Sequence, residues 1–344
     1  MRLYDRFPRY ATAALAVMLM AGCTDAPRPV LAEFGGMTMG TSFTVKVVTP
    51  GGVADMGRLQ RTVDQRLREI DQRMSTYIPD SELSRLNHNR DPGWIDLSPE
   101  LHEVIRLALD ISALTGGAFD ITIGPVVNLW GFGPDAATRH VPDPETLRAI
   151  RDRTGFDKLQ LAHGRPALRK HLPEIYIDLS GIAKGYGVDA VATSLEANGI
   201  GSYMVEVGGE VRARGYNVAG RPWQIGIEQP LTGSRAVERV VALHDMAMAT
   251  SGDYRNYFEE GGVRYSHIVD PVSGTPIRHR LASVTVLDTA ATRADALATA
   301  LLVLGPDAGP TLAEREGIPA FFIIRAGDGF EDHWTSHMQR WFSD

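Results

Sequence analysis

The chain has 344 residues, of which 44% are hydrophobic and 22% are charged, and these values are typical of a globular protein with one large domain or two joined ones. The formal net charge of −7, with no basic tract after the first ten residues, argues against a nucleic-acid partner. A single cysteine, Cys23, excludes an intramolecular disulfide.

The N-terminus has the pattern of a secretory signal. Arg2, Arg6 and Arg9 precede the apolar run ATAALAVMLMAG, which ends at Cys23 and is too short to span a membrane. The end of this run, LMAGC, resembles a bacterial lipobox, which implies cleavage before Cys23 and lipidation of that residue. A plain signal peptide with a chance cysteine is the alternative. We expect a lipoprotein signal peptide at 1–22, a flexible tether at 23–36 and one folded domain at 37–344.

The first half of the domain is predicted to contain a strand and two helices. Alternation predicts a strand at 42–49, and apolar residues at helical spacing predict a helix at 57–74. A second helix is predicted after Ser98, a typical N-cap that is followed by Pro99. The segment 117–134 is apolar and rich in glycine, and we expect an ordered loop there.

The second half mixes strands and helices. We predict helices at 144–155, 182–198 and 292–305, and strands at 174–179, 203–215, 223–230, 238–252, 281–288 and 317–324. Gly208 and Gly209 interrupt one strand region and indicate a bulge or a close approach. Since strands and helices do not alternate strictly, we predict an α+β fold with mixed, largely antiparallel sheets and packed helices.

The stretch YIDLSGIAKGYGVDAV, at 176–191, looks at first like a phosphate-binding loop. Its glycine spacing excludes both a Walker loop and a Rossmann fingerprint, and Lys184 is followed by Gly185 and Tyr186 instead of Ser or Thr. The start of a helix can nevertheless bind phosphate, and Lys184 would add charge. A tight turn with a solvated lysine is the alternative interpretation.

Two further stretches contain candidate metal-binding or catalytic residues. Asp295 and Thr299 are four residues apart among apolar neighbours, so on a helix they would present two oxygen ligands suited to Mg²⁺. The alternative is a helix cap and a hydroxyl bonded to its own helix. His267 precedes an Asp-Pro turn and is our candidate general base, with a structural hairpin histidine as the alternative.

These stretches together resemble a known family. Its motifs occur in order as MGTSF, MSTYIPDSELSRLN, GGAFDITIGPVVNLWGF, DLSGIAKGYGVD, VEVGGEVRARG, TSGDYRNYF, SHIVDPVSGTPI and ADALATALLVLG, between about Met39 and Gly305. The chain closely resembles the ApbE family, the FAD:protein FMN transferases. The resemblance implies an ApbE-like fold, a flavin transferase domain at 37–344, and transfer of FMN from FAD to a threonine or serine hydroxyl of a protein with release of AMP.

The resemblance also assigns roles to residues. It implies that Asp295 and Thr299 bind Mg²⁺ together with a backbone carbonyl, for which we choose Gly181 over Ala183. His267 matches the proposed base, and some members have Glu in place of Lys184, which argues against a catalytic lysine. FAD contacts are implied at Met39, Tyr77, Ala118, Phe119, Asp120, Asp178, Lys184 and Val269.

FAD is thus expected as a substrate and Mg²⁺ as a cofactor. The implied partners are subunits like those of the sodium-translocating quinone reductase and the RNF complex. We expect a lipid anchor in the inner membrane on the periplasmic side, with Asp25 after Cys23 compatible with retention there. The alternatives are a periplasmic FAD pyrophosphatase and an FAD-binding lipoprotein without transfer.

Overall fold

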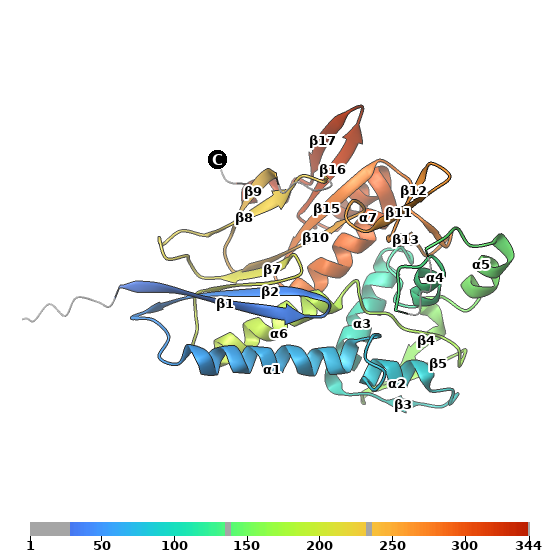
Figure 1. Ribbon diagram of the computed structural model, residues 1–344, viewed down its shortest axis with the longest axis horizontal. Coiled ribbons are helices and arrows are strands. Elements are labelled where there is room, and N and C mark those ends of the chain that lie inside the picture. Colours follow the sequence, from blue (N-terminus) through green and yellow to red (C-terminus); the bar gives the residue numbers. More distant parts are fainter. Residues whose placement is uncertain (1–27, 135–138, 232–235, 343–344) are drawn as a thin grey trace, which may run out of the picture.

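The computed structural model describes residues 28–134, 139–231 and 236–342 (Figure 1). The expected signal peptide and Cys23 lie outside the described residues. The expected tether is wrong in its second half, because β1 (Pro29–Thr38) pairs along its whole length with β2 (Thr41–Pro50). Gly35 fits this pairing because a Cβ there would lie 2.5 Å from the carbonyl oxygen of Phe43. The glycines that suggest flexibility in the sequence therefore allow close packing.

An eight-stranded sheet forms the centre of the described part of the protein, and all of its neighbouring strands are antiparallel. Its order is β1-β2-β6-β7-β10-β15-β16-β17, where the last six are β6 (Tyr203–Val207), β7 (Glu210–Arg214), β10 (Met246–Gly252), β15 (Leu281–Asp288), β16 (Ala320–Ala326) and β17 (Gly329–Trp334). Together with the packed helices, this sheet confirms the predicted α+β class.

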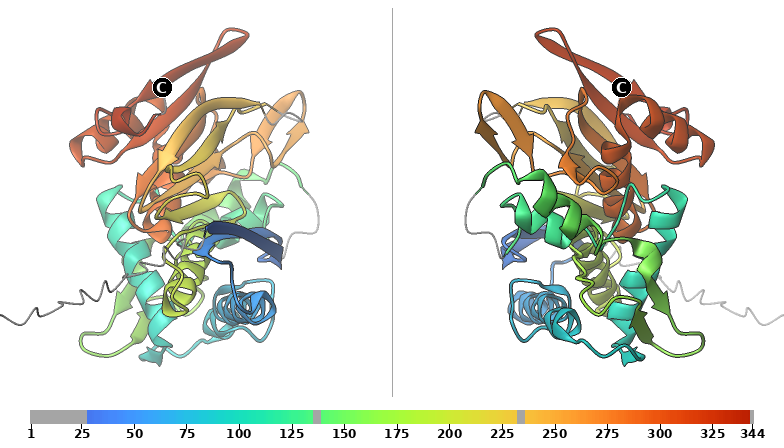
Figure 2. Two further views of the ribbon diagram at one scale, coloured as in Figure 1. Left: turned by 90° about the vertical axis from the view of Figure 1, so that its left-hand side faces the viewer. Right: turned by 90° about the vertical axis from the view of Figure 1, so that its right-hand side faces the viewer.

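Three helices cover one face of the sheet: α1 (Met56–Met74), α6 (Ala183–Ala197) and α7 (Ala291–Arg315) (Figures 1 and 2). α7 packs on β10 and β15, α6 packs on α7, and α1 packs on α6. The buried residues of α1 are those whose spacing predicts the helix: Leu59, Val63, Leu67, Ile70 and Met74. By length and composition α7 could cross a membrane, but more than half of its apolar window is buried in the protein, as expected for a core helix.

The opposite face of the sheet carries the hairpin of β8 (Trp223–Glu228) and β9 (Val237–Leu243) and the short helix η2 (Gln339–Trp341). Trp223, Met248 and Phe321 belong to the apolar cluster between this hairpin and the sheet. The sheet is therefore packed on both faces, with helices on one side and a hairpin on the other (Figure 2).

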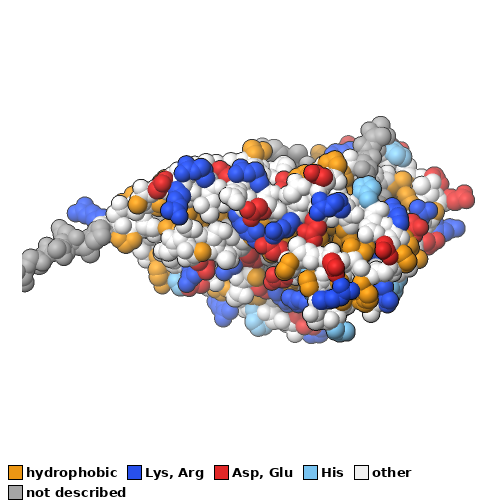
Figure 3. Space-filling model, turned by 90° about the horizontal axis from the view of Figure 1, so that it is seen from below, with side chains coloured by type: hydrophobic (Ala, Val, Ile, Leu, Met, Phe, Trp, Pro, Cys, Tyr) orange, Lys and Arg blue, Asp and Glu red, His pale blue; other side chains and the backbone are white. Residues whose placement is uncertain are grey.

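A helical lobe packs beside the helix face of the sheet. It contains α2 (Glu82–His88), α3 (Pro99–Leu114), α4 (Gly124–Leu129), α5 (Pro144–Arg151), η1 (Phe156–Lys158) and a small sheet of β3 (Ile95–Asp96), β5 (Ala167–Lys170) and β4 (Leu159–Leu161). As predicted, Ser98 caps α3 by accepting a hydrogen bond from the Leu101 N–H at 3.3 Å. On the face that carries α1, basic and acidic side chains are interspersed (Figure 3), as in the 2.7 Å pair of Arg66 and Glu100.

Two short hairpins complete the described elements: β11 (Tyr257–Glu260) with β12 (Val263–Ser266), and β13 (Val269–Asp270) with β14 (Thr275–Pro276). Gly208 and Gly209, with φ of 59° and 104°, form the turn between β6 and β7, so the predicted bulge is wrong. The alternative, a close approach, is confirmed at Gly208, where a Cβ would lie 2.8 Å from the Thr41 Cγ2. The predicted helix at 292–305 is the first part of α7, which kinks at Gly305, where φ is 82°.

Two sequence predictions, for the segments 117–134 and 174–179, are wrong. The segment 117–134 contains the helix α4, which begins at Gly124 and Pro125. The glycines and prolines of this segment are typical of a loop, so they do not indicate a helix. The segment 174–179 is not a strand. Its backbone bonds to a side chain instead, because Ile177 donates to the Asn87 amide oxygen at 2.7 Å and accepts from the Asn87 nitrogen at 2.8 Å.

Candidate functional site

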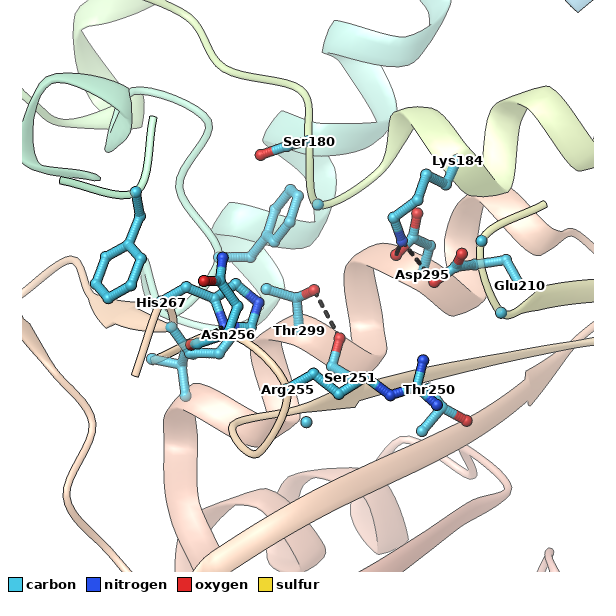
Figure 4. A pocket seen from close by; sticks show the side chains of 18 of the residues that line it. Ser180, Lys184, Glu210, Thr250, Ser251, Arg255, Asn256, His267, Asp295 and Thr299 are labelled. Carbon is cyan, nitrogen blue, oxygen red and sulfur yellow. Dashed lines mark hydrogen bonds and ion pairs between the residues drawn. The ribbon is translucent and has the colours of Figure 1, made fainter. Parts of the chain in front are cut away.

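A cavity of about 670 Å³ lies where the helical lobe meets α6, α7, the end of β10 and the β12–β13 connection (Figure 4). Most residues that the sequence analysis singled out line this cavity, although they come from distant parts of the chain. They are Tyr77, Ala118, Phe119, Asp120, Asp178, Gly181, Lys184, His267, Val269, Asp295 and Thr299.

Two of the named residues lie outside the cavity lining. Met39 is in the turn between β1 and β2 with a positive φ of 47°, and its side chain packs against Gly187 of α6. The structure therefore does not place Met39 in the cavity wall, because the turn directs it onto a helix. Ala183, the alternative to Gly181, begins α6 and is also absent from the lining, whereas Gly181 belongs to it.

Asp295, Thr299 and Gly181 converge at one wall of the cavity. The Asp295 side chain is 3% exposed, and its Oδ2 accepts a hydrogen bond from the Gly185 N–H at 3.0 Å. Thr299 lies one turn further along α7, with its Oγ1 3.0 Å from the Ser251 Oγ (Figure 4). A Cβ on Gly181 would lie 3.6 Å from that same Oγ1, so glycine leaves this space open. A carboxylate and a hydroxyl beside an open backbone fit the oxygen ligands that Mg²⁺ prefers.

The position of this wall is fixed by the crossing of α6 and α7. A Cβ on Gly185 would lie 2.3 Å from the Ala291 carbonyl oxygen, so only glycine lets the two helices come this close. The Asp189 carboxylate of α6 also caps α7, accepting from the N–H groups of Ala291 at 3.0 Å and Thr292 at 2.9 Å. Arg212 holds the same carboxylate at 2.7 Å. These contacts set the start of α7 and hence the place of Asp295.

Lys184 pairs with two carboxylates at the edge of the cavity. Its Nζ lies 2.6 Å from Glu210 Oε1 and 3.7 Å from Asp295 Oδ1 (Figure 4). Burial opposes its charge, but Asp295 and Glu210 outweigh burial and raise the pKa of Lys184. Burial, aided by the charge of Asp295, raises the pKa of Glu210 despite the ion pair. Glu210 is not among the residues predicted from the sequence, because its partner is 26 residues away and its local signal is limited to its place after a double-glycine turn.

His267 faces the cavity in a defined tautomer. Its Nδ1 lies 3.1 Å from the Asn256 carbonyl oxygen, which also accepts the His267 backbone N–H at 3.0 Å. Because a carbonyl can only accept, the proton is on Nδ1 and Nε2 is left as an acceptor. Burial lowers the pKa of His267, so its imidazole stays neutral at neutral pH. The arrangement meets the requirements of a general base.

The opposite side of the cavity is built by the helical lobe. Burial raises the pKa of Asp120, yet its carboxylate accepts from Thr122 N–H and Oγ1, both at 2.7 Å, and from Phe156 N–H at 3.0 Å. Asp120 thus holds two loops together. Tyr77 is 68% exposed and can present its ring to a flat ligand. Other lining residues that the sequence analysis did not find include Ser180, Ile225, Glu228, Thr250, Ser251, Arg255 and Asn256.

Known proteins resemble this chain over most of its length. The family model described as the ApbE family matches residues 39–322. A protein of Vibrio cholerae named FAD:protein FMN transferase is 45% identical over 97% of this chain and 99% of its own, and one of Salmonella typhimurium is 40% identical over 96% of each.

Solved structures agree with these relatives. The flavin transferase ApbE from Vibrio cholerae matches with a TM-score of 0.85 at 44% identity, covering 91% of this chain and 99% of that chain. The apo form of the flavinyl transferase ApbE from Pseudomonas stutzeri matches with a TM-score of 0.84 at 42% identity, covering 92% and 98%. The chain belongs to the ApbE family.

Proposed function

We propose that this enzyme transfers FMN from FAD to a threonine or serine hydroxyl of a target protein, in a Mg²⁺-dependent reaction that releases AMP. The observation that carries the proposal is the meeting of Asp295, Thr299 and Gly181 with an acceptor-ready His267 in one cavity. The names of the relatives, FAD:protein FMN transferase, support the same reaction.

The metal site would use the carboxylate of Asp295, the hydroxyl of Thr299 and the carbonyl of Gly181. Mg²⁺ bound there would neutralise pyrophosphate charge and polarise the phosphorus. α6 begins at this wall, so the positive end of its dipole lies there, and Lys184 adds a positive charge beside Asp295. These groups favour binding of the FAD pyrophosphate next to Asp295. Tyr77 at the cavity mouth would stack on one of the FAD rings.

The transfer step exchanges one bond for another. The acceptor hydroxyl oxygen forms a bond to the phosphorus of the FMN half, while the bond from that phosphorus to the bridging oxygen breaks and AMP leaves with the electron pair. His267 Nε2 takes the hydroxyl proton. The enzyme needs no nucleophile of its own, because the target protein supplies it. Catalysis rests on positioning and charge neutralisation.

Mass spectrometry separates this function from its alternatives. The enzyme is incubated with FAD, Mg²⁺ and a fragment of a target subunit of the kind found in the sodium-translocating quinone reductase or the RNF complex. Transfer adds the mass of FMN to the fragment. Free FMN with an unmodified fragment would instead mean an FAD pyrophosphatase, and intact FAD would mean an FAD-binding lipoprotein.

We also propose that Cys23 is lipidated and anchors the enzyme on the periplasmic side of the inner membrane. The lipobox pattern that ends at Cys23 supports this location. A Cys23→Ser variant should be released from membranes or remain unprocessed, as judged by fractionation and mass. Membrane fractionation and processing identical to those of the wild type would contradict the anchor.

A further inference from the structure

The cavity reaches both faces of the central sheet at the end of β10. Ser251 faces α7, because its hydroxyl lies 3.0 Å from that of Thr299. Thr250, the preceding residue, faces the other side, where its hydroxyl lies 2.8 Å from that of Thr285. Both residues line the cavity, and so does Ile225 of the hairpin β8–β9. The cavity therefore passes around the edge of β10.

This passage exists because β7 is shorter than β10. β7 pairs with β10 from Met246↔Ala213 to Met248↔Val211, and the chain then turns away through Gly209 and Gly208. From residue 249 to 252, β10 still pairs with β15 on one edge, but no strand of the described chain lies along the other. Residues 247–249 are buried, whereas residues 250–252 are only half-buried. The end of β10 thus presents a free strand edge inside the cavity.

A free strand edge offers alternating N–H and C=O groups, which an extended peptide can pair with. The reaction needs such a second substrate, and it must reach the same centre as FAD. The positions that match FAD contacts, such as Tyr77, Phe119 and Asp178, belong to the helical lobe and its junction with α6. The edge of β10 lies on the other side of Thr299, as the pairing of Ser251 with Thr299 shows (Figure 4).

We propose, resting on the function proposed above, that the acceptor segment of the target protein binds as an added strand along residues 249–252 of β10. Side chains of a strand alternate between the two faces of the sheet. The acceptor hydroxyl then points to the α7 side with Ser251, toward Thr299 and His267. Its two immediate neighbours point to the hairpin side, where Ile225 and the buried Met248 supply an apolar wall.

The test removes single backbone N–H groups from the acceptor. The target fragment is assembled by chemical ligation with one N-methylated amide at each of four successive positions beside the acceptor residue, and initial rates of flavinylation are measured by mass. Strand addition predicts alternation: loss of one buried backbone hydrogen bond should lower the rate about tenfold or more at every second position and little at those between. FAD affinity, measured without the fragment, should be the same throughout.

A pair of enzyme variants checks the same surface from the other side. Ile225→Glu places a charge in the acceptor half of the cavity and should raise the KM for the fragment about tenfold while FAD affinity stays unchanged. Val240→Glu is the control, because Val240 lies on the neighbouring strand β9, is exposed and does not line the cavity.

A methylation profile without alternation would overturn the added strand, and so would wild-type KM in a folded Ile225→Glu variant. If Ile225→Glu does not fold, the methylation profile alone decides. Failure of the unmodified ligated fragment to accept FMN would instead contradict the proposed transfer activity.

Discussion

Lys170 and Lys184 both carry an ammonium group into the protein, but their surroundings are opposite. Lys170, on β5, is 1% exposed and donates to three backbone carbonyls, those of Leu86 at 3.2 Å, Asn89 at 2.6 Å and Ile175 at 3.4 Å. Burial, with a smaller effect of the charge on Arg90, lowers the pKa of Lys170 to about 8. Lys184 instead meets the carboxylates of Glu210 and Asp295, which raise its pKa.

The difference separates a structural charge from a functional one. Two of the carbonyls that Lys170 binds, those of Leu86 and Asn89, lie at the end of α2, where the regular i to i+4 hydrogen bonds of the helix stop. Lys170 therefore caps the C-terminal end of α2, and it does not line the cavity. Lys184 lines the cavity and compensates the negative charges of Glu210 and of the proposed metal ligand Asp295. Changes near Lys184 should therefore affect catalysis, and changes at Lys170 should affect stability.

The largest effect is expected for Asp295→Ala. This change removes the carboxylate of the proposed metal site, so the pyrophosphate charge is no longer compensated, and transfer should fall by about 10³-fold or more. Single-turnover transfer at limiting Mg²⁺ measures the loss. Wild-type activity of the variant at low Mg²⁺ would exclude the site at Asp295.

His267→Ala should lower the transfer rate by about 10²–10⁴-fold, because the variant has no base for the acceptor hydroxyl. FAD affinity should change little, and measuring both quantities on one preparation tests this. A variant that binds FAD weakly but transfers normally would make His267 structural. Because burial lowers the pKa of His267 from its ordinary 6.5, wild-type activity should persist at pH 6.5 and fall only as the pH drops through the lower value.

Lys170→Met should act on stability and spare activity. The substitution keeps an unbranched apolar stem but removes the ammonium donor from the carbonyls of Leu86, Asn89 and Ile175, so the free energy of unfolding should fall by about 2–4 kcal/mol. Urea unfolding measures this change, and the transfer rate at a temperature where the variant is folded serves as the control. A tenfold loss of transfer in the folded variant would remove the distinction between the two lysines.

The last expected effect is a pH dependence of stability at Lys170. With a folded pKa of about 8 and an ordinary value of 10.5, the unfolded chain binds more protons than the folded one between these values. Wild-type stability should therefore rise with pH across this window. The difference in unfolding free energy between wild type and Lys170→Met isolates this contribution, because the variant lacks the titrating group. A difference that stays constant or falls would contradict the lowered pKa.

The sequence predicts best those elements whose signal is local. The spacing of Leu59, Val63 and Leu67 marks α1, and Ser98 marks the start of α3, as the structure confirms. The segment 174–179 looks like a strand, but the side chain of Asn87, about ninety positions away, takes its hydrogen bonds. The same limit applies to β1, whose pairing partner decides its conformation more than its glycines do.

Some residues of the candidate site can likewise be predicted from local sequence, and others cannot. Asp295 and Thr299 can be recognised from their i, i+4 spacing, and His267 from the turn that follows it. Glu210 and Ser251 cannot, because their importance depends on contacts with Lys184 and Thr299 that only the folded chain creates. The i, i+4 spacing therefore predicts the proposed metal ligands, whereas the charged groups around them are found only in the structure.

The narrow crossing of α6 and α7 also limits how this protein can be engineered. Any side chain at Gly185 would separate the two helices, and with them the Gly185 N–H from the Asp295 carboxylate. Even alanine would therefore weaken folding and the proposed metal site together. Stabilising mutations elsewhere could restore folding, but they would not return Asp295 to its place. In a library selected for activity, position 185 should keep glycine however much spare stability the starting protein has.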